Sequence, residues 1–158
     1  MIIHPIPPLF DGESKTLILG SFPSVKSREA AFFYGHPQNR FWTVSAAVLG
    51  CPKPVSVEEK KKMILENRLA MWDVIASCEI EGSADSTIKN VTANDLSVIL
   101  DNSKVERIIV NGKTAEKFYN KYTYPETGIK TICLPSTSPA NAAWSIEKLV
   151  EAWKIIAL

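Results

Sequence analysis

The residues best suited to chemistry lie in one short run, Phe33-Tyr34-Gly35-His36-Pro37-Gln38-Asn39-Arg40-Phe41-Trp42. Amides and a cation beside aromatic faces suit a flat ligand with polar edges, such as a nucleobase, which offers both a stacking face and hydrogen-bonding groups. Any one of these residues is also explained by a helix start with buried aromatics. The whole run, taken with a second polar segment near the C-terminus, favours a binding site.

That second segment reads Leu134-Pro135-Ser136-Thr137-Ser138-Pro139-Ala140-Asn141. Its short hydroxyls, and backbone N–H groups expected to stay free at a helix start, suit phosphate oxygens. The alternative is a plain strand-to-helix turn rich in capping residues. Lys113, in an Asn-Gly-Lys sequence that is also common in ordinary turns, could add a phosphate contact.

Length and composition predict one domain over residues 1–158, with a net charge of +1 that neither indicates nor excludes a nucleic-acid partner. No stretch is apolar enough to span a membrane, and the N-terminus does not resemble a signal peptide, so we expect a cytoplasmic protein. Cys51, Cys78 and Cys133 are too widely spaced to indicate a zinc or iron–sulfur site. We expect no metal and no cofactor.

Short apolar runs alternate with helical patterns along the chain. Strands are expected over residues 16–22, 69–75, 107–110 and 130–134. Helices are expected over residues 39–49, 56–68, 92–100 and 114–122, and from 145 onward. This alternation predicts an α/β fold, a three-layer α/β/α arrangement around a mostly parallel four-stranded sheet. Both polar segments would then lie at the crevice beyond the carboxyl ends of the strands.

Three segments carry a resemblance to a known family: Gly20-Ser21-Phe22-Pro23-Ser24, the His36-to-Trp42 run and the Leu134-to-Asn141 run. Together they resemble the hypoxanthine-DNA glycosylases of the uracil-DNA glycosylase superfamily. The resemblance implies a uracil-DNA glycosylase-like fold and a monofunctional glycosylase acting in base excision repair. Its substrate would be DNA containing a deaminated base, hypoxanthine (deoxyinosine) first. The HPxNRFW motif is shared with mismatch-specific uracil glycosylases, so a uracil or G:U/G:T mismatch activity stays open.

One position departs from most of the superfamily. The first turn usually carries an Asn or Asp that activates water, and here that position is Phe22, preceded by Ser21. Neither side chain suits the task. The resemblance to the hypoxanthine branch implies that Asn39 takes over, and we predict that its carbonyl accepts a hydrogen bond from water and places it near the anomeric carbon. A helix-capping role for Asn39 is the alternative.

The resemblance, together with the residue types, also suggests which residues bind the base and which contact DNA. Tyr34 is predicted to stack on the flipped base, unless it is a core tyrosine, and His36 to hydrogen-bond the base or hold its loop in shape. Ser21 and Phe22 would line the base pocket. The residues predicted to contact DNA are Ser136, Thr137, Ser138, Pro139, Asn141 and Lys113.

Several roles stay open. Arg40 could contact the DNA backbone or pair with a carboxylate inside the fold. Asp73 and Asp85 lie near the predicted crevice and could orient a catalytic group. No motif marks a lysine as a Schiff-base nucleophile, so we expect simple hydrolysis by a monomer. A non-catalytic DNA- or nucleotide-binding module is the alternative from another class.

Overall fold

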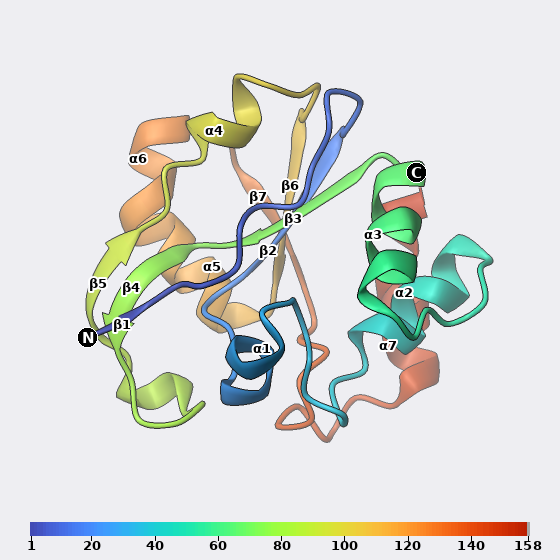
Figure 1. Cartoon of the computed structure of the whole chain (residues 1–158), viewed down its shortest axis with the longest axis horizontal. Helices are drawn as coiled ribbons and strands as arrows, with labels where there is room; N and C mark the ends of the chain where they lie inside the picture. The colour runs from blue at the N-terminus through green and yellow to red at the C-terminus, as the bar shows by residue number, and fades with distance from the viewer. Residues whose placement is uncertain (158) are drawn as a thin grey trace.

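Two β-sheets organise the chain, whose computed structural model describes residues 1–157 (Figure 1). The central sheet is parallel throughout, with strand order β3-β2-β6-β7. Its strands are β2 (Thr16–Gly20), β3 (Leu69–Asp73), β6 (Arg107–Asn111) and β7 (Thr131–Leu134). The four strands match the expected runs to within a few residues, and the α/β prediction is confirmed.

Helices cover both faces of this sheet because its strands are apolar on both sides. In β2, Ile18 faces one core while Leu17 and Leu19 face the other, since successive side chains of a strand point to opposite faces. The first core is closed by α2 (Phe41–Leu49), α3 (Val57–Glu66) and α7 (Ile146–Trp153). The second is closed by α4 (Ser97–Leu100), α5 (Lys113–Phe118) and the π-helix η2 (Tyr119–Thr123). The remaining helical segments are α1 (Val25–Ala30), η1 (Asp85–Thr87), α6 (Tyr124–Thr127) and η3 (Lys154–Ala157).

A second, antiparallel sheet of order β1-β4-β5 was not expected from the sequence. It consists of β1 (Ile2–Ile3), β4 (Ile75–Glu79) and β5 (Lys89–Ala93), and it lies on the α5 side of the molecule (Figure 1). The predicted strand over 69–75 is therefore interrupted at Val74, where the chain passes from one sheet into the other.

The predicted helix over 92–100 is wrong in its first half. Residues 89–93 form the exposed strand β5, whose polar composition hides its pairing with β4. Asp95 lies just before the helix that follows, and its Oδ1 accepts a hydrogen bond from Ser97 N at 3.0 Å. That helix is only the short α4. The helix predicted to begin at residue 56 starts with a capping box, in which the Ser56 hydroxyl accepts from Glu59 N and the Glu59 carboxylate accepts from Ser56 N.

The topology fixes where a ligand can bind. The chain goes from β2 outward to β3 and then returns to β6 on the other side of β2, so the strand order reverses between β2 and β6. Parallel α/β sheets bind ligands beyond the carboxyl ends of their strands at such a point. Among residues 1–157, no helix is both long and apolar enough to cross a membrane.

Candidate active site

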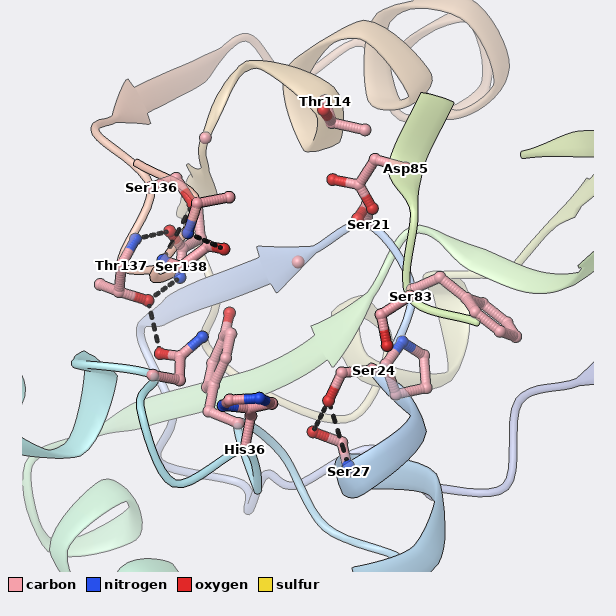
Figure 2. A pocket seen from close by; sticks show the side chains of 18 of the residues that line it. Ser21, Ser24, Ser27, His36, Ser83, Asp85, Thr114, Ser136, Thr137 and Ser138 are labelled. Atoms are coloured by element: carbon pink, nitrogen blue, oxygen red, sulfur yellow. Dashed lines mark hydrogen bonds between the residues drawn. The ribbon is translucent and has the colours of Figure 1, made fainter. Parts of the chain in front are cut away.

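A pocket of about 450 Å³ opens at these strand ends (Figure 2). Its lining comes from residues within 20–27, 33–39, 80–85, 111–114 and 136–140, together with Asp73. The two polar segments singled out in the sequence therefore meet, although about a hundred residues separate them. A volume in this range is typical of sites that enclose a small organic group.

A chain of hydrogen bonds joins the two segments through Thr137, which is fully buried (Figure 2). Asn111 Nδ2 donates to Thr137 Oγ1 at 3.0 Å, and Thr137 Oγ1 donates to Asn39 Oδ1 at 2.9 Å. Thr137 N donates back to Asn111 Oδ1 at 3.1 Å. Asn39, at the start of α2, is thus fixed by a residue of the C-terminal loop and, through it, by the end of β6.

These contacts determine which atom of Asn39 faces a ligand. Its Oδ1 also accepts from Phe41 N at 2.9 Å, and a backbone N–H can only donate, so the amide orientation is fixed. Because Oδ1 accepts from both Phe41 N and Thr137 Oγ1, both of its lone pairs are occupied. Nδ2 makes no hydrogen bond within residues 1–157, and Asn39 lines the pocket. The sequence predicts a water-accepting carbonyl, but this structure presents the amide N–H₂ group instead.

Tyr34 lies in the same pocket in a strained backbone conformation. Its φ of 51° is unusual for a bulky residue, which makes it a candidate functional position. Its ring stacks on Phe41, with centroids 4.4 Å apart and planes 20° from parallel. Burial, followed by the nearby Asp73 carboxylate, raises the pKa of the Tyr34 phenol far above its usual value, and a hydrogen bond with Asn111 opposes this. The hydroxyl is therefore neutral.

His36 lines the pocket with a defined arrangement of its ring nitrogens. Gln38 N donates to His36 Nδ1 at 3.1 Å. A neutral imidazole that accepts at Nδ1 carries its proton on Nε2. His36 can therefore both shape its loop and donate from Nε2; the two readings of this residue are compatible.

The first turn also contributes to the lining. Ser21 is half-buried and Phe22 is 8% exposed, and both face the pocket. Phe22 packs edge-on against His4, with centroids 5.9 Å apart, and beneath the guanidinium of Arg28. Its position gives an apolar surface and no acceptor for water.

The loop over residues 135–144 differs from expectation in its backbone. Helix α7 begins only at Ile146, so the loop is not a helix start. Its N–H groups bind within the fold: Ser138 N donates to Ser136 Oγ, Ala140 N to Ser138 Oγ and Asn141 N to Ser138 O. The predicted free N–H groups are therefore not found at Thr137, Ser138, Ala140 or Asn141. The hydroxyls of Ser136 and Ser138 act as acceptors in these contacts and keep their protons for an outside acceptor.

Two residues predicted to contact DNA face elsewhere. The Thr137 side chain is buried between the two asparagines, so it cannot reach a phosphate in this conformation. Asn141 lies outside the pocket lining, and its Nδ2 donates to Ser136 O at 3.0 Å. Ser136, Ser138, Pro139 and the exposed Lys113 do line the opening.

The Arg40 side chain binds the loop over residues 135–144. Its guanidinium donates to four backbone carbonyls of the loop: Ser138 O at 2.8 Å, Asn141 O at 3.0 Å, Thr137 O at 3.4 Å, and Trp144 O. Arg40 forms no salt bridge to a carboxylate within residues 1–157, so the predicted ion pair inside the fold is wrong. Arg40 therefore fixes the loop that carries Thr137.

The opposite wall comes from the segment between β4 and β5. Val25 N donates to Ser83 Oγ at 2.9 Å, and an Arg28 N–H donates to Gly82 O at 2.6 Å, which ties this segment to α1. Asp85 faces Thr114 across the pocket mouth (Figure 2). Desolvation raises the pKa of the Asp85 carboxyl, and hydrogen bonding from Thr114 lowers it.

Two contributors were missed by sequence reasoning. Asn111 was noted only as part of an ordinary turn, although its amide holds Thr137. His4 contacts Asp73 across 69 positions, and no local signal marks it. Among residues 1–157, no group of three or more His, Cys, Asp or Glu side chains is placed to hold a metal ion.

Comparison with known proteins agrees with this geometry. The family described as "Uracil DNA glycosylase superfamily" matches residues 7–157. The chain belongs to this superfamily. The family resemblance noted in the sequence is confirmed.

Individual superfamily members are similar over most of the chain. A curated protein of Methanosarcina acetivorans, named "Hypoxanthine DNA glycosylase", is 33% identical over 99% of this chain and 98% of its own length. A protein of the same name from Methanosarcina barkeri is 29% identical over 85% of each chain. The solution NMR structure of a candidate uracil DNA glycosylase from Methanosarcina acetivorans superposes with a TM-score of 0.81, at 31% identity and full coverage of both chains.

Proposed function

We propose that this chain is a monofunctional DNA glycosylase that hydrolyses the N-glycosidic bond of a flipped deaminated base, with hypoxanthine as its first substrate. The observation that carries the proposal is the Asn39–Thr137–Asn111 hydrogen-bond chain at the pocket of a superfamily member. The glycosidic bond is inaccessible within a duplex, so the base must leave the stack and enter a pocket.

Asn39 is the proposed catalytic residue, through its amide N–H₂ group. Breaking the glycosidic bond leaves negative charge on the departing base. A donor already fixed in position stabilises that charge without reorganising during the reaction, which is the basis of electrostatic catalysis. Thr137 and Phe41 N fix the carbonyl side of Asn39, so its Nδ2 is the part that can act on a ligand.

The aromatic and imidazole groups are assigned to the base. Tyr34 is proposed to stack on it, His36 to donate from Nε2 to an acceptor on its edge, and Ser21 and Phe22 to complete the surrounding wall. Ser136, Ser138, Pro139 and Lys113 are proposed to contact the DNA strand beside the pocket. We reassign Thr137 and Asn141 to positioning, because both side chains are bound within the fold.

Lys113 is the single lysine among the pocket-lining residues that the structure describes. A lysine nucleophile would form a Schiff base with the sugar and lead to strand cleavage. We propose hydrolysis instead, with Lys113 as a phosphate contact, and we propose that the protein acts as a monomer in the cytoplasm within base excision repair.

The test uses matched duplex oligonucleotides that carry one hypoxanthine, one uracil or no lesion. Each is incubated with the protein and then treated with or without alkali, and strand breaks are counted. Breaks at hypoxanthine that need alkali are expected, because hydrolysis leaves an abasic site.

Each other pattern has a distinct meaning. Breaks only at uracil would favour the uracil or mismatch activity that the shared motif and the candidate uracil glycosylase neighbour suggest. Breaks without alkali would assign a nucleophilic role to Lys113. Binding of DNA without any strand breakage would instead favour the alternative that the protein is a non-catalytic DNA-binding module.

A further inference from the structure

A buried carboxylate reaches the floor of the pocket from the end of β3. Asp73 is only 4% exposed, yet it lines the pocket. It pairs in register with Gly20 of β2. A Cβ atom at Gly20 would lie 2.4 Å from Asp73 Oδ1 and 3.3 Å from the Tyr34 hydroxyl. The missing side chain at Gly20 therefore lets the carboxylate extend over β2 beside the tyrosine.

The two oxygens of this carboxylate have different surroundings. Oδ2 accepts a hydrogen bond from His4 Nε2 at 2.7 Å. Oδ1 has no hydrogen-bond partner within residues 1–157, and it is not among the fully enclosed polar atoms that lack one. A carboxylate oxygen only accepts, and buried polar groups are almost always satisfied. Oδ1 is thus an acceptor open to a donor from a ligand.

His4 holds the carboxylate in this orientation. Ile6 N donates to His4 Nδ1 at 3.2 Å, so the ring proton lies on Nε2 and points at Asp73. The imidazole is enclosed, with its ring edge-on to Phe22 and Trp72. Neither the ring nor its proton can easily rearrange, and Oδ2 stays bound to His4.

Deamination creates the kind of donor that this oxygen lacks. Adenine has an unprotonated ring nitrogen at position 1, while hypoxanthine carries N1–H there. Cytosine and uracil differ in the same way at position 3. An acceptor on the pocket floor therefore favours deaminated bases and repels their parents, whose ring nitrogen lone pair would face the carboxylate.

We propose that Asp73, positioned by His4, reads this ring N–H and is the residue that separates deaminated bases from adenine and cytosine. This inference rests on the proposed glycosylase function. It assigns specificity to Asp73 and positioning to His4, while the chemistry stays with Asn39.

Asp73→Asn tests the assignment by exchanging the acceptor that faces the pocket for a donor. His4 Nε2–H still requires an acceptor, so the new carbonyl would face His4 and the new amide N–H₂ would face the pocket. The variant then presents a donor where the wild type presents an acceptor. Single-turnover excision rates are measured on duplexes with hypoxanthine and with adenine. The hypoxanthine-to-adenine rate ratio should fall by roughly 10- to 100-fold, the range for a hydrogen bond to a charged group.

The outcomes separate this inference from the proposed function. If the wild type excises hypoxanthine and the variant keeps the same rate ratio, the reading role is wrong while the function stands. If the variant binds abasic-analogue DNA normally but both excision rates fall by the same factor, so that their ratio is unchanged, Asp73 acts in the chemistry and the inference is also overturned. If the wild type excises nothing, the function itself fails.

A second measurement needs no Asp73 variant. Free hypoxanthine, 1-methylhypoxanthine and adenine are compared as inhibitors of the wild type. Adenine and 1-methylhypoxanthine lack the N1–H group and should inhibit at least tenfold more weakly than hypoxanthine. Equal inhibition by hypoxanthine and adenine would overturn the reading role. His4→Gln, which keeps a donor, should retain more of the excision rate ratio than His4→Phe, and equal retention would remove His4 from the account.

Discussion

The Thr137 hydroxyl donates a hydrogen bond to the Asn39 amide oxygen at 2.9 Å, across 98 positions of the chain. The same hydroxyl accepts from Asn111 Nδ2, so one buried oxygen orients both asparagines. Together with Phe41 N, this short side chain of the C-terminal loop fixes which group of Asn39 faces the pocket.

Thr137→Val removes this hydroxyl while keeping its shape. Asn111 Nδ2 loses its acceptor and Asn39 loses a donor, so we expect a loss of about 1–3 kcal/mol in the free energy of unfolding. Excision of hypoxanthine should slow by roughly tenfold or more, because a misplaced catalytic group loses its orientation. Chemical denaturation and single-turnover kinetics check both. Thr137→Ser, which keeps the hydroxyl, should stay close to wild type; equal losses in both variants would contradict the hydrogen-bond argument.

Arg40→Gln removes the clamp on the loop at residues 137–144. Arg107→Gln is the matched control, since Arg107 also donates to a backbone carbonyl, Ile155 O at 2.9 Å, but outside the pocket. Both changes should lower the free energy of unfolding by about 1–3 kcal/mol. Only Arg40→Gln should also slow excision at temperatures where both proteins remain folded. Equal rates in the two variants would show that the loop does not depend on Arg40.

Gly112→Ala tests the turn that leads from β6 into α5. Gly112 has φ 94° and ψ 168°, a region nearly restricted to glycine, and its Cβ would lie 2.9 Å from Ser136 Cβ. We expect a loss of about 1–3 kcal/mol in stability, together with slower excision, because Ser136 must move. Gly128→Ala provides the comparison: its φ is 67°, and a Cβ there would meet no atom within 4 Å. A cost at Gly112 no larger than at Gly128 would contradict the close-contact argument.

Asp85→Asn should change stability in a pH-dependent way. Desolvation raises the pKa of this carboxyl in the folded protein, so the charged form is less favourable folded than unfolded. Stability is therefore lost as pH rises from below the ordinary carboxyl pKa to above the raised one. The variant should melt at a higher temperature than wild type at pH 7, with the advantage disappearing on acidification below pH ~4, near the unperturbed Asp pKa. Melting curves across this range check it, and a constant difference would rule out titration of Asp85 as the cause.

The sequence predicted the parallel sheet well because each central strand is a continuous apolar run. Residues 107–110, for example, combine β-branched side chains with a following Asn-Gly turn, and the structure places a strand there. The second sheet was not predicted, because one of its strands lacks such an apolar run. β5 is polar, and its pairing with β4 depends on contacts that no local pattern reveals.

Some features of the candidate site could likewise be predicted from the sequence, and others could not. The two polar segments could be assigned to one face because carboxyl ends of parallel strands share an edge. The sequence could not show which Asn39 atom faces the pocket, because that depends on Thr137 and on Phe41 N. It also could not assign Arg40, whose partners are backbone carbonyls without any sequence signal.

The measurement that tests the central claim most directly compares Asn39→Asp with Asn39→Ala on hypoxanthine-containing duplex. Asp keeps an acceptor for Phe41 N and Thr137 Oγ1 but replaces the N–H₂ donor with a charged acceptor oxygen, whereas Ala removes both groups. If the amide acts as a donor, single-turnover excision should fall by on the order of 100-fold or more in both variants, while abasic-analogue DNA still binds. An active Asn39→Asp protein beside an inactive Asn39→Ala protein would contradict the donor role and return catalysis to an oxygen that accepts from water.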